Sequence, residues 1–186
     1  MDLSRYGEII YRAVEKCPFC SNVSMEVQEV LYEIPHFGKT ILHIHACSSC
    51  GYRHIDLQYV EEVKPRKMIY PVDDEEDVTE TLIFRSKTCK IYSPELGFSI
   101  DPGQAAEALI TTLEGLLYKV KDYAETMLTL TEEEGVRDRI VNFIRKINDA
   151  IRGNLKFTII LEDPMGNSII KPPSHRVEKL IIENLQ

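Results

Sequence analysis

Cys17-Pro18-Phe19-Cys20 and Cys47-Ser48-Ser49-Cys50 are two C-x-x-C pairs, separated by residues 21–46 of this sequence. Each C-x-x-C turn directs two sulfur atoms and several backbone N–H groups toward one point, and two such turns brought together make a closed tetrahedral site of four thiolates. Thiolate ligands in this number favour zinc. We therefore predict one Zn²⁺ per chain, held by Cys17, Cys20, Cys47 and Cys50.

Three other readings of the same cysteines remain open at this point: two disulfides, a rubredoxin-type iron site, or buried thiols without a ligand. The spacing matches a zinc-ribbon pattern, and nothing in the sequence marks the chain as secreted, so zinc is the preferred interpretation. A closed site of four cysteines has no open coordination position, which argues against a metalloenzyme. No Ser-His-Asp or Cys-His arrangement has local support either, so we predict no catalytic site and no small-molecule substrate.

A chain of 186 residues is long enough for either one domain or two small domains. A cysteine module of about 50 residues has too small a core to fold without help, so metal binding there is expected to supply folding free energy directly. Removing zinc should therefore unfold this module.

The charge balance, 22 basic against 30 acidic residues for a net charge of −8, opposes a nucleic-acid partner unless the basic residues gather on one face. The acidic run Asp73–Asp77 is expected to be a solvated loop. The sequence contains no apolar stretch of about 18 residues, and its beginning lacks the layout of a signal peptide. We therefore expect a cytoplasmic protein without a membrane partner.

Alternating apolar residues predict strands over residues 23–34, 41–46 and 55–59, with a bulge or bend near Gln28-Glu29 and a turn at residues 35–39. These strands join the two cysteine pairs in a module that we place at residues 1–62. Cys89 is expected to be a small buried residue of a later strand.

Residues 63–186 are predicted to form a second domain. Strand patterns cover much of residues 78–100 and 155–161, and between them apolar residues recur at spacings of three and four. A possible N-cap at Asp101 and a capping box at Thr131 indicate two helices, and Gly153 indicates the end of the second. The fold class is therefore α+β, with an antiparallel helical hairpin at about residues 102–152 inserted into the second domain.

The turn between the first two strands contains the candidate partner-binding residues, His36 and Phe37. An aromatic residue at the tip of a long hairpin has little core to reach, so it is a candidate anchor for a partner. The alternative is that Phe37 packs on its own domain. His43 and His45 lie close to Cys47 in the sequence, but four cysteines already complete a zinc coordination shell.

Several short motifs occur in the order found in the ZPR-type zinc-finger proteins, and the chain resembles that family over about residues 15–170. The motifs are Cys17-Pro-Phe-Cys20, Ile34-Pro35-His36-Phe37, Cys47-Ser-Ser-Cys50-Gly51-Tyr52-Arg53, Pro94-Glu95-Leu96, Thr111-Thr112-Leu113-Glu114-Gly115 and Phe157-Thr158-Ile-Ile-Leu-Glu-Asp163-Pro164-Met-Gly166-Asn167-Ser168.

The resemblance implies a Cys₄ zinc module followed by a β-sandwich domain that carries a helical hairpin. It also implies the archaeal single-unit form, since eukaryotic members repeat the two-part unit in tandem. Eukaryotic members bind translation elongation factor 1-alpha and act as a chaperone for its folding, so the resemblance implies a non-enzymatic chaperone or adaptor for that GTPase. The alternative function is a nucleic-acid-binding zinc ribbon of the transcription or translation machinery, which the net charge disfavours.

Overall fold

The computed structural model describes residues 7–34, 37–60, 64–103, 106 and 108–185. The chain divides into two compact units. One comprises Met1–Val63 together with Ala105–Ala108, and the other comprises Lys64–Gln104 together with Leu109–Gln186.

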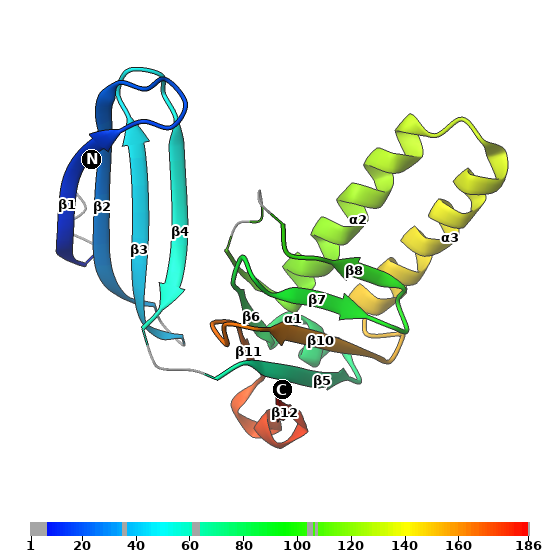
Figure 1. Ribbon diagram of the computed structural model, residues 1–186. Coiled ribbons are helices and arrows are strands. Elements are labelled where there is room, and N and C mark those ends of the chain that lie inside the picture. The colour runs from blue at the N-terminus through cyan, green and yellow to red at the C-terminus, as the bar shows by residue number, and fades with distance from the viewer. Residues whose placement is uncertain (1–6, 35–36, 61–63, 104–105, 107, 186) are drawn as a thin grey trace. The chain divides into compact units, whose positions relative to one another are not determined.

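The N-terminal unit contains one antiparallel sheet with strand order β1-β2-β3-β4 (Figure 1). The sequence predicts the last three of these strands. It does not predict β1, because almost all of its residues are exposed and no apolar alternation marks it. The strands are β1 (Glu8–Lys16), β2 (Val23–Ile34), β3 (Gly38–Cys47) and β4 (Arg53–Tyr59).

The predicted bulge near Gln28-Glu29 is placed on the wrong strand. The β2–β3 register runs without a shift from the pair Met25 and Cys47 to the pair Ile34 and Gly38. The irregularity is in β1, between Ile9 and Tyr11, opposite the same part of β2. The extra residue of β1 thus lies opposite the part of β2 where the apolar pattern changes phase.

The C-terminal unit is built on two sheets whose side chains share one hydrophobic core. Tyr70 and Ile159 enter this core from the larger sheet, and Ile83 and Ile170 enter it from the smaller one. The five-stranded sheet has the order β12 (Ile181–Asn184), β5 (Arg66–Val72), β10 (Phe157–Asp163), β7 (Lys90–Ser93) and β8 (Phe98–Ile100), and the three-stranded sheet has the order β11 (Ile169–Lys171), β6 (Leu82–Arg85) and β9 (Leu109–Thr112).

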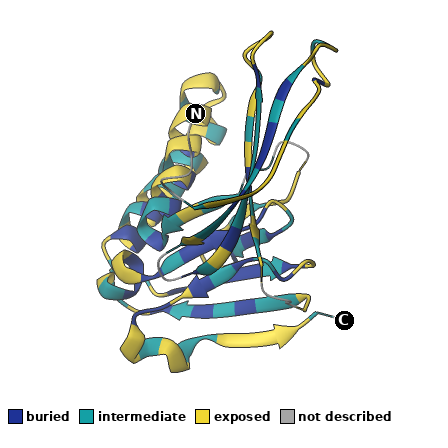
Figure 2. Ribbon diagram, turned by 90° about the vertical axis from the view of Figure 1, so that its left-hand side faces the viewer, coloured by how far each residue is buried: buried dark blue, intermediate teal, exposed yellow. Residues whose placement is uncertain are grey.

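Two long helices, α2 (Leu113–Leu130) and α3 (Glu134–Ile151), lie side by side and project from the sheets (Figure 1). Their apolar residues near the sheets belong to the core, whereas the far end of the pair is largely exposed (Figure 2). Among the described residues, no helix is both long and apolar enough to cross a membrane.

The predicted start of the first helix, near Asp101, is wrong. Leu109–Thr112 instead pair with Leu82–Arg85 as strand β9, and α2 begins only at Leu113. Thr112 is the N-cap, with its hydroxyl oxygen accepting a hydrogen bond from the backbone N–H of Gly115 at 3.0 Å. Pairing with a distant strand outweighs the local capping signal, because it provides hydrogen-bond partners for the backbone N–H and C=O groups of the whole segment.

The predicted capping box at Thr131 is also wrong. The N-cap of α3 is Glu133, which makes no side-chain cap bond, and Thr131 is the C-cap of α2. Arg137 in the first turn of α3 donates from Nη1 to the backbone oxygens of Leu128 and Thr131, at 2.8 and 2.7 Å. One arginine thus satisfies two carbonyl groups that the end of α2 leaves without helical partners.

The predicted helix end at Gly153 is confirmed. Gly153 has φ of +70°, and its N–H donates to the oxygen of Ala150 while the N–H of Asn154 donates to the oxygen of Asp149. This pair of hydrogen bonds is the Schellman motif, which favours glycine at the left-handed position.

The prediction that Asp73–Asp77 form a solvated loop is wrong. The run leads into a short helix, α1 (Glu75–Glu80), whose N-cap Asp74 accepts from the backbone N–H of Asp77. Asp77 has no exposed surface. Its carboxylate pairs with Arg176 and Lys179 of the 3₁₀ helix η1 (Ser174–Lys179). One carboxylate of a charged run that looks solvated in sequence, that of Asp77, is therefore buried against cations from a segment near the C-terminus.

Candidate metal centre

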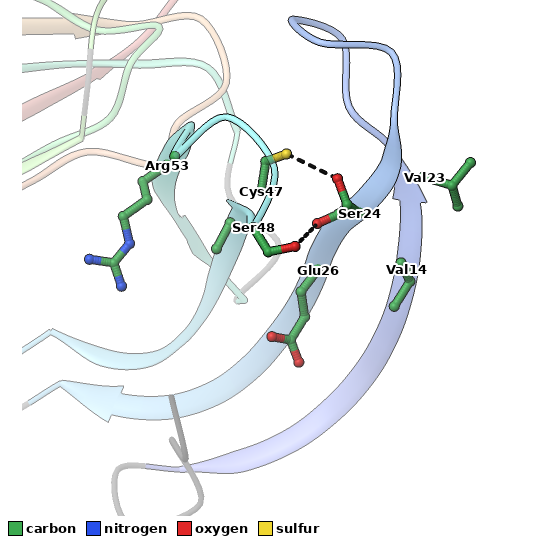
Figure 3. A pocket seen from close by; sticks show the side chains of 9 residues that line it. Val14, Val23, Ser24, Glu26, Cys47, Ser48 and Arg53 are labelled. Atoms are coloured by element: carbon green, nitrogen blue, oxygen red, sulfur yellow. Dashed lines mark hydrogen bonds between the residues drawn. The ribbon is translucent and has the colours of Figure 1, made fainter.

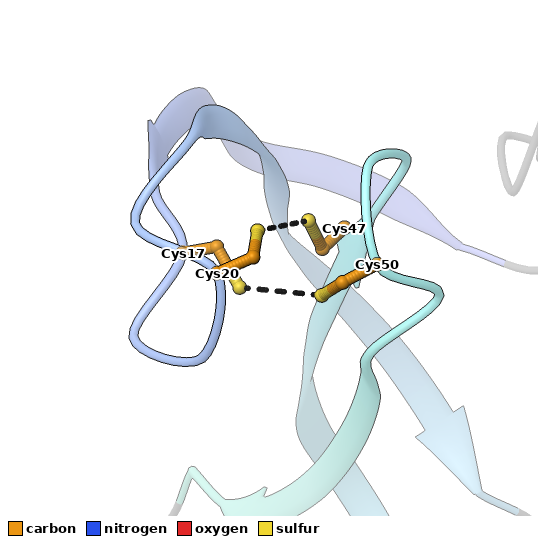
Figure 4. A group of neighbouring side chains, drawn as sticks. All are labelled: Cys17, Cys20, Cys47 and Cys50. Atoms are coloured by element: carbon orange, nitrogen blue, oxygen red, sulfur yellow. Dashed lines mark hydrogen bonds between the residues drawn. The ribbon is translucent and has the colours of Figure 1, made fainter.

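The four predicted ligands lie together in the N-terminal unit (Figure 4). The Sγ atoms of Cys17 and Cys50 are 3.7 Å apart, and those of Cys20 and Cys47 are 3.6 Å apart. All four sulfur atoms lie within 4.8 Å of one another. β1 and β3 position the two pairs, since Cys17 follows the last residue of β1 and Cys47 is the last residue of β3.

These distances fit a tetrahedral metal ion. With a Zn–S bond of about 2.3 Å, the sulfur atoms of a regular tetrahedron are about 3.8 Å apart. They do not fit disulfides, whose sulfur atoms are bonded at about 2.05 Å, and all five cysteines are free. Cys17, Cys20, Cys47 and Cys50 would thus hold one zinc ion, which would tie together the two ends of the sheet's central hairpin.

The two cysteine turns have the same backbone geometry. The N–H of Cys17 donates to the oxygen of Asn22, and the N–H of Cys47 donates to the oxygen of Tyr52. The fourth residue after the first cysteine of each pair, Ser21 or Gly51, has positive φ and donates its N–H back to that cysteine's oxygen. Each turn is therefore shaped by its own hydrogen bonds, and the pair of turns presents four sulfur atoms to one point.

The pKa values of the cysteine thiols also favour binding of a cation at the cluster. The hydroxyl of Ser24 lies 3.3 Å from Cys47 Sγ, and this hydrogen bond lowers the pKa of Cys47 to about 6. At Cys50 the backbone N–H of Tyr52 acts in the same direction, but burial and the neighbouring sulfurs outweigh it and raise the pKa to about 12. One thiolate thus opposes the ionisation of the next, and a bound divalent cation would remove this conflict.

The remaining sequence candidates lie outside the cluster. His43 contacts Gln58 and Glu29 through its two ring nitrogens, and His45 stacks edge-on against His54 with ring centroids 6.1 Å apart. Cys89 is buried in the C-terminal unit, as predicted, but it lies directly before strand β7 and not within a strand.

His36 lies outside the described residues. Phe37 is buried, with 4% of its surface exposed, so in this structure the ring is not presented to solvent as a partner anchor would be. Its role in partner binding stays a prediction.

Two supporting contacts at the centre were not anticipated from the sequence. Ser24 hydrogen-bonds Cys47 across the two turns, and the rings of Phe19 and Tyr52 lie against each other with centroids 4.3 Å apart. No spacing rule marks these residues, because they meet only when β2 and β3 bring the turns together. Phe19, the aromatic residue inside the first C-x-x-C pair, is the one sequence feature that could have indicated such a contact.

The ZPR1 zinc-finger domain matches residues 8–65, and the ZPR1 jelly-roll domain matches residues 76–186. A ZPR1-like protein of Pyrococcus horikoshii is 30% identical over 174 residues, which cover 91% of this chain and 78% of the relative. A ZPR1-like protein of Methanocaldococcus jannaschii is also 30% identical, over 83% of this chain and 78% of the relative.

In the eukaryotic relatives, the match with this chain covers a smaller share of the relative's length than in the two archaeal proteins. The zinc finger chaperone zpr1 of Schizosaccharomyces pombe is 32% identical over 83% of this chain but only 34% of its own length, and the human zinc finger protein ZPR1 gives the same figures. The two matched family domains contain the four-cysteine cluster and most of the β-rich domain described above. The chain belongs to the ZPR1 family, with a zinc-finger domain whose cysteines are arranged for one zinc ion and a jelly-roll domain after it.

Proposed function

We propose that this protein is a zinc-dependent, non-enzymatic chaperone or adaptor that binds translation elongation factor 1-alpha and assists the folding of this GTPase in the cytoplasm. The relative from Schizosaccharomyces pombe is named a zinc finger chaperone. The partner is the one that the resemblance to the ZPR-type family implies, and the motifs that carry this resemblance continue through both domains.

The observation that carries a protein-binding function is an exposed apolar stripe on α2. Tyr123, Met127 and Leu130 are 73%, 55% and 74% exposed. Their spacing of four and three residues places them on one face of the helix. The stripe lies toward the end of α2 that connects to α3, beyond the part of the helix that the core covers. Exposed apolar side chains grouped in this way mark surfaces that bind other proteins.

The zinc site has a structural role in this proposal. Four cysteines complete the coordination of zinc, so the ion would hold the N-terminal sheet together and leave no position for a substrate. In this proposal the zinc ion stabilises the N-terminal unit and takes no part in chemistry.

Binding of purified elongation factor 1-alpha, measured by titration calorimetry in its nucleotide-free and GTP forms, tests the proposal. Met127→Asp introduces a charge into the stripe and should weaken the complex at least about tenfold. Glu125→Ala lies on another side of the same helix and should leave the affinity unchanged. If the protein binds neither form, the partner assignment is refuted. A tight, sequence-specific complex with nucleic acid would favour the alternative function.

Phe37 is tested separately in the same titration. Because the ring is buried, Phe37→Ala should lower the melting temperature of the free protein. If Phe37 also acts as an anchor when the partner binds, affinity should fall by more than the loss of stability explains. An unchanged affinity would exclude the anchor role and leave the stripe on α2 as the proposed contact.

A further inference from the structure

One face of the N-terminal sheet carries a row of side chains that crosses all four strands. Val14 of β1 lies opposite Glu26 of β2, Glu26 lies opposite Ala46 of β3, and Ala46 lies opposite Arg53 of β4. Directly paired residues point to the same face of a sheet. The small side chain of Ala46 therefore leaves a hollow between the carboxylate of Glu26 and the guanidinium of Arg53.

Two cavities occupy this hollow. The larger, of about 520 Å³, is lined by Glu26, Ala46 and Arg53 together with residues of the metal centre, among them the predicted ligand Cys47 (Figure 3). The smaller, of about 110 Å³, shares these three residues and extends to Gln28 and Ile55. The two cavities thus form one groove across the strands, at the end of the sheet where the cysteines lie.

Glu26 is held as a carboxylate on one side of the groove. Its Oε1 atom accepts hydrogen bonds from Gln28 Nε2 at 2.8 Å and from Arg12 Nε at 2.8 Å, with a further contact from Arg12 Nη2. These bonds from Gln28 and Arg12 lower the pKa of Glu26 below its usual value. All three donors reach Oε1, so Oε2 accepts no hydrogen bond from the described residues.

Gln28 supplies a buried acceptor that lacks a partner. Its side chain is 95% buried, with 5% exposed, and its Oε1 atom has no hydrogen-bond partner. The amide orientation is dictated by Glu26, because only the NH₂ group of Gln28 can donate to that carboxylate. A buried oxygen without a donor is costly, and a ligand with an N–H group would satisfy it.

Arg53 supplies an unpaired cation on the other side. It is exposed and forms no side-chain hydrogen bond or ion pair with any residue that the structure describes. Ile55 and Val14, which are 58% and 63% exposed, provide apolar surface on either side of the groove.

We propose that this groove binds an acidic side chain presented by an extended segment of a protein partner. Arg53 pairs with the carboxylate, and the free acceptors of Glu26 and Gln28 receive main-chain N–H groups of the same segment. β2 and β4 are two strand spacings apart, about 10 Å, which an extended segment spans with about three residues. Apolar residues on either side of the acidic one pack on Val14 and Ile55. The proposed site follows from the chemistry of the groove, so it does not depend on which partner protein carries the segment.

The probe is a capped tetrapeptide of leucines with one internal aspartate, titrated into the zinc-loaded full chain and followed by NMR. We expect shifts at the Ala46 methyl group and the Gln28 side-chain amide. The matched peptide with asparagine in place of aspartate should bind about tenfold more weakly, because it loses the charge-assisted pair with Arg53. Equal binding of the two peptides would overturn the proposal.

Two variants of the protein test the residues involved. Arg53→Gln should weaken the aspartate peptide about tenfold and leave the asparagine peptide unchanged, and Ala46→Leu should fill the hollow and reduce binding of both. Arg139→Gln, an exposed arginine of α3, is the control and should have no effect. Zinc content and melting temperature confirm that each variant is folded. Full binding by folded Arg53→Gln, or shifts confined to other parts of the chain, would exclude this site.

Discussion

Tyr70 donates a hydrogen bond from its hydroxyl group to Asp77 Oδ1 at 2.6 Å, and neither residue has exposed surface. Asp77 also pairs with Arg176 and Lys179, at 2.9 and 2.5 Å. The first turn of α1 is thereby joined to the core strand β5 and to the segment near the C-terminus. Burial by itself would raise the pKa of Asp77, but the hydrogen bonds from Lys179 and Tyr70 outweigh it and hold the pKa well below the usual value.

Asp77→Asn should lower the free energy of unfolding of the C-terminal unit by about 3 kcal/mol, because two cations lose their buried partner. Urea denaturation followed by circular dichroism measures the change. Glu80→Gln, at the exposed end of the same helix, is the control and should change stability by less than about 0.5 kcal/mol. An Asp77→Asn variant as stable as the wild type would show that the pairing contributes nothing net.

Stability should decrease as the pH falls below about 4. The pKa values of Asp73, Asp74 and Asp77 are all lowered in the folded state by their bonds to Lys179 and Arg176, so the unfolded chain binds protons first. A group with a lowered pKa stabilises the fold above its unfolded value, near 3.9, and this contribution is lost at more acidic pH. Melting temperatures between pH 6 and pH 2 should show this loss, and Asp77→Asn should show a smaller one.

Ser24→Ala should reduce zinc affinity about tenfold, because a hydrogen bond to a metal ligand orients it and stabilises its charged form. Competition with a chromophoric chelator gives the affinity directly. Ser49→Ala changes an exposed serine within the second C-x-x-C pair and should leave the affinity unchanged. If both variants bind zinc equally well, the contact between Ser24 and Cys47 has no influence on the metal.

Removing one predicted ligand should unfold the N-terminal sheet. Cys47→Ser should lose zinc and the protection of β2 and β3 amides against hydrogen exchange, since a small unit depends on its metal for folding. Cys89→Ser should keep one zinc ion per chain by elemental analysis, because Cys89 lies in the other unit. Wild-type protein without zinc after purification in the absence of chelators would contradict the predicted metal.

Gly153→Ala should destabilise the C-terminal unit by about 2 kcal/mol or more, because alanine is strained at positive φ. Its Cβ would also lie 2.3 Å from the backbone nitrogen of Glu75, so α1 would have to move. Gly135→Ala is the matched control, since an added Cβ there meets nothing within 4 Å. That substitution should stabilise α3 by about 0.5 kcal/mol. Thermal unfolding of both variants gives the comparison, and equal effects would argue against the close approach at Gly153.

The sequence by itself determined the features that depend on near neighbours. A C-x-x-C turn forms through its own hydrogen bonds, so the spacing alone predicts the four ligands. The alternation in β2 and β3 and the helical end at Gly153 are likewise local patterns, and they predicted the strands and the cap.

The tertiary structure decided the features that depend on residues far apart in the chain. Residues 109–112 form a strand because β6 is available to pair with them, and β1 is a strand because β2 covers one of its edges. Asp77 is buried because cations about a hundred residues later return to it. Capping and periodicity depend on residues close together in the sequence, so they cannot predict a contact with a distant residue. Burial and strand pairing depend on the fold of the whole chain.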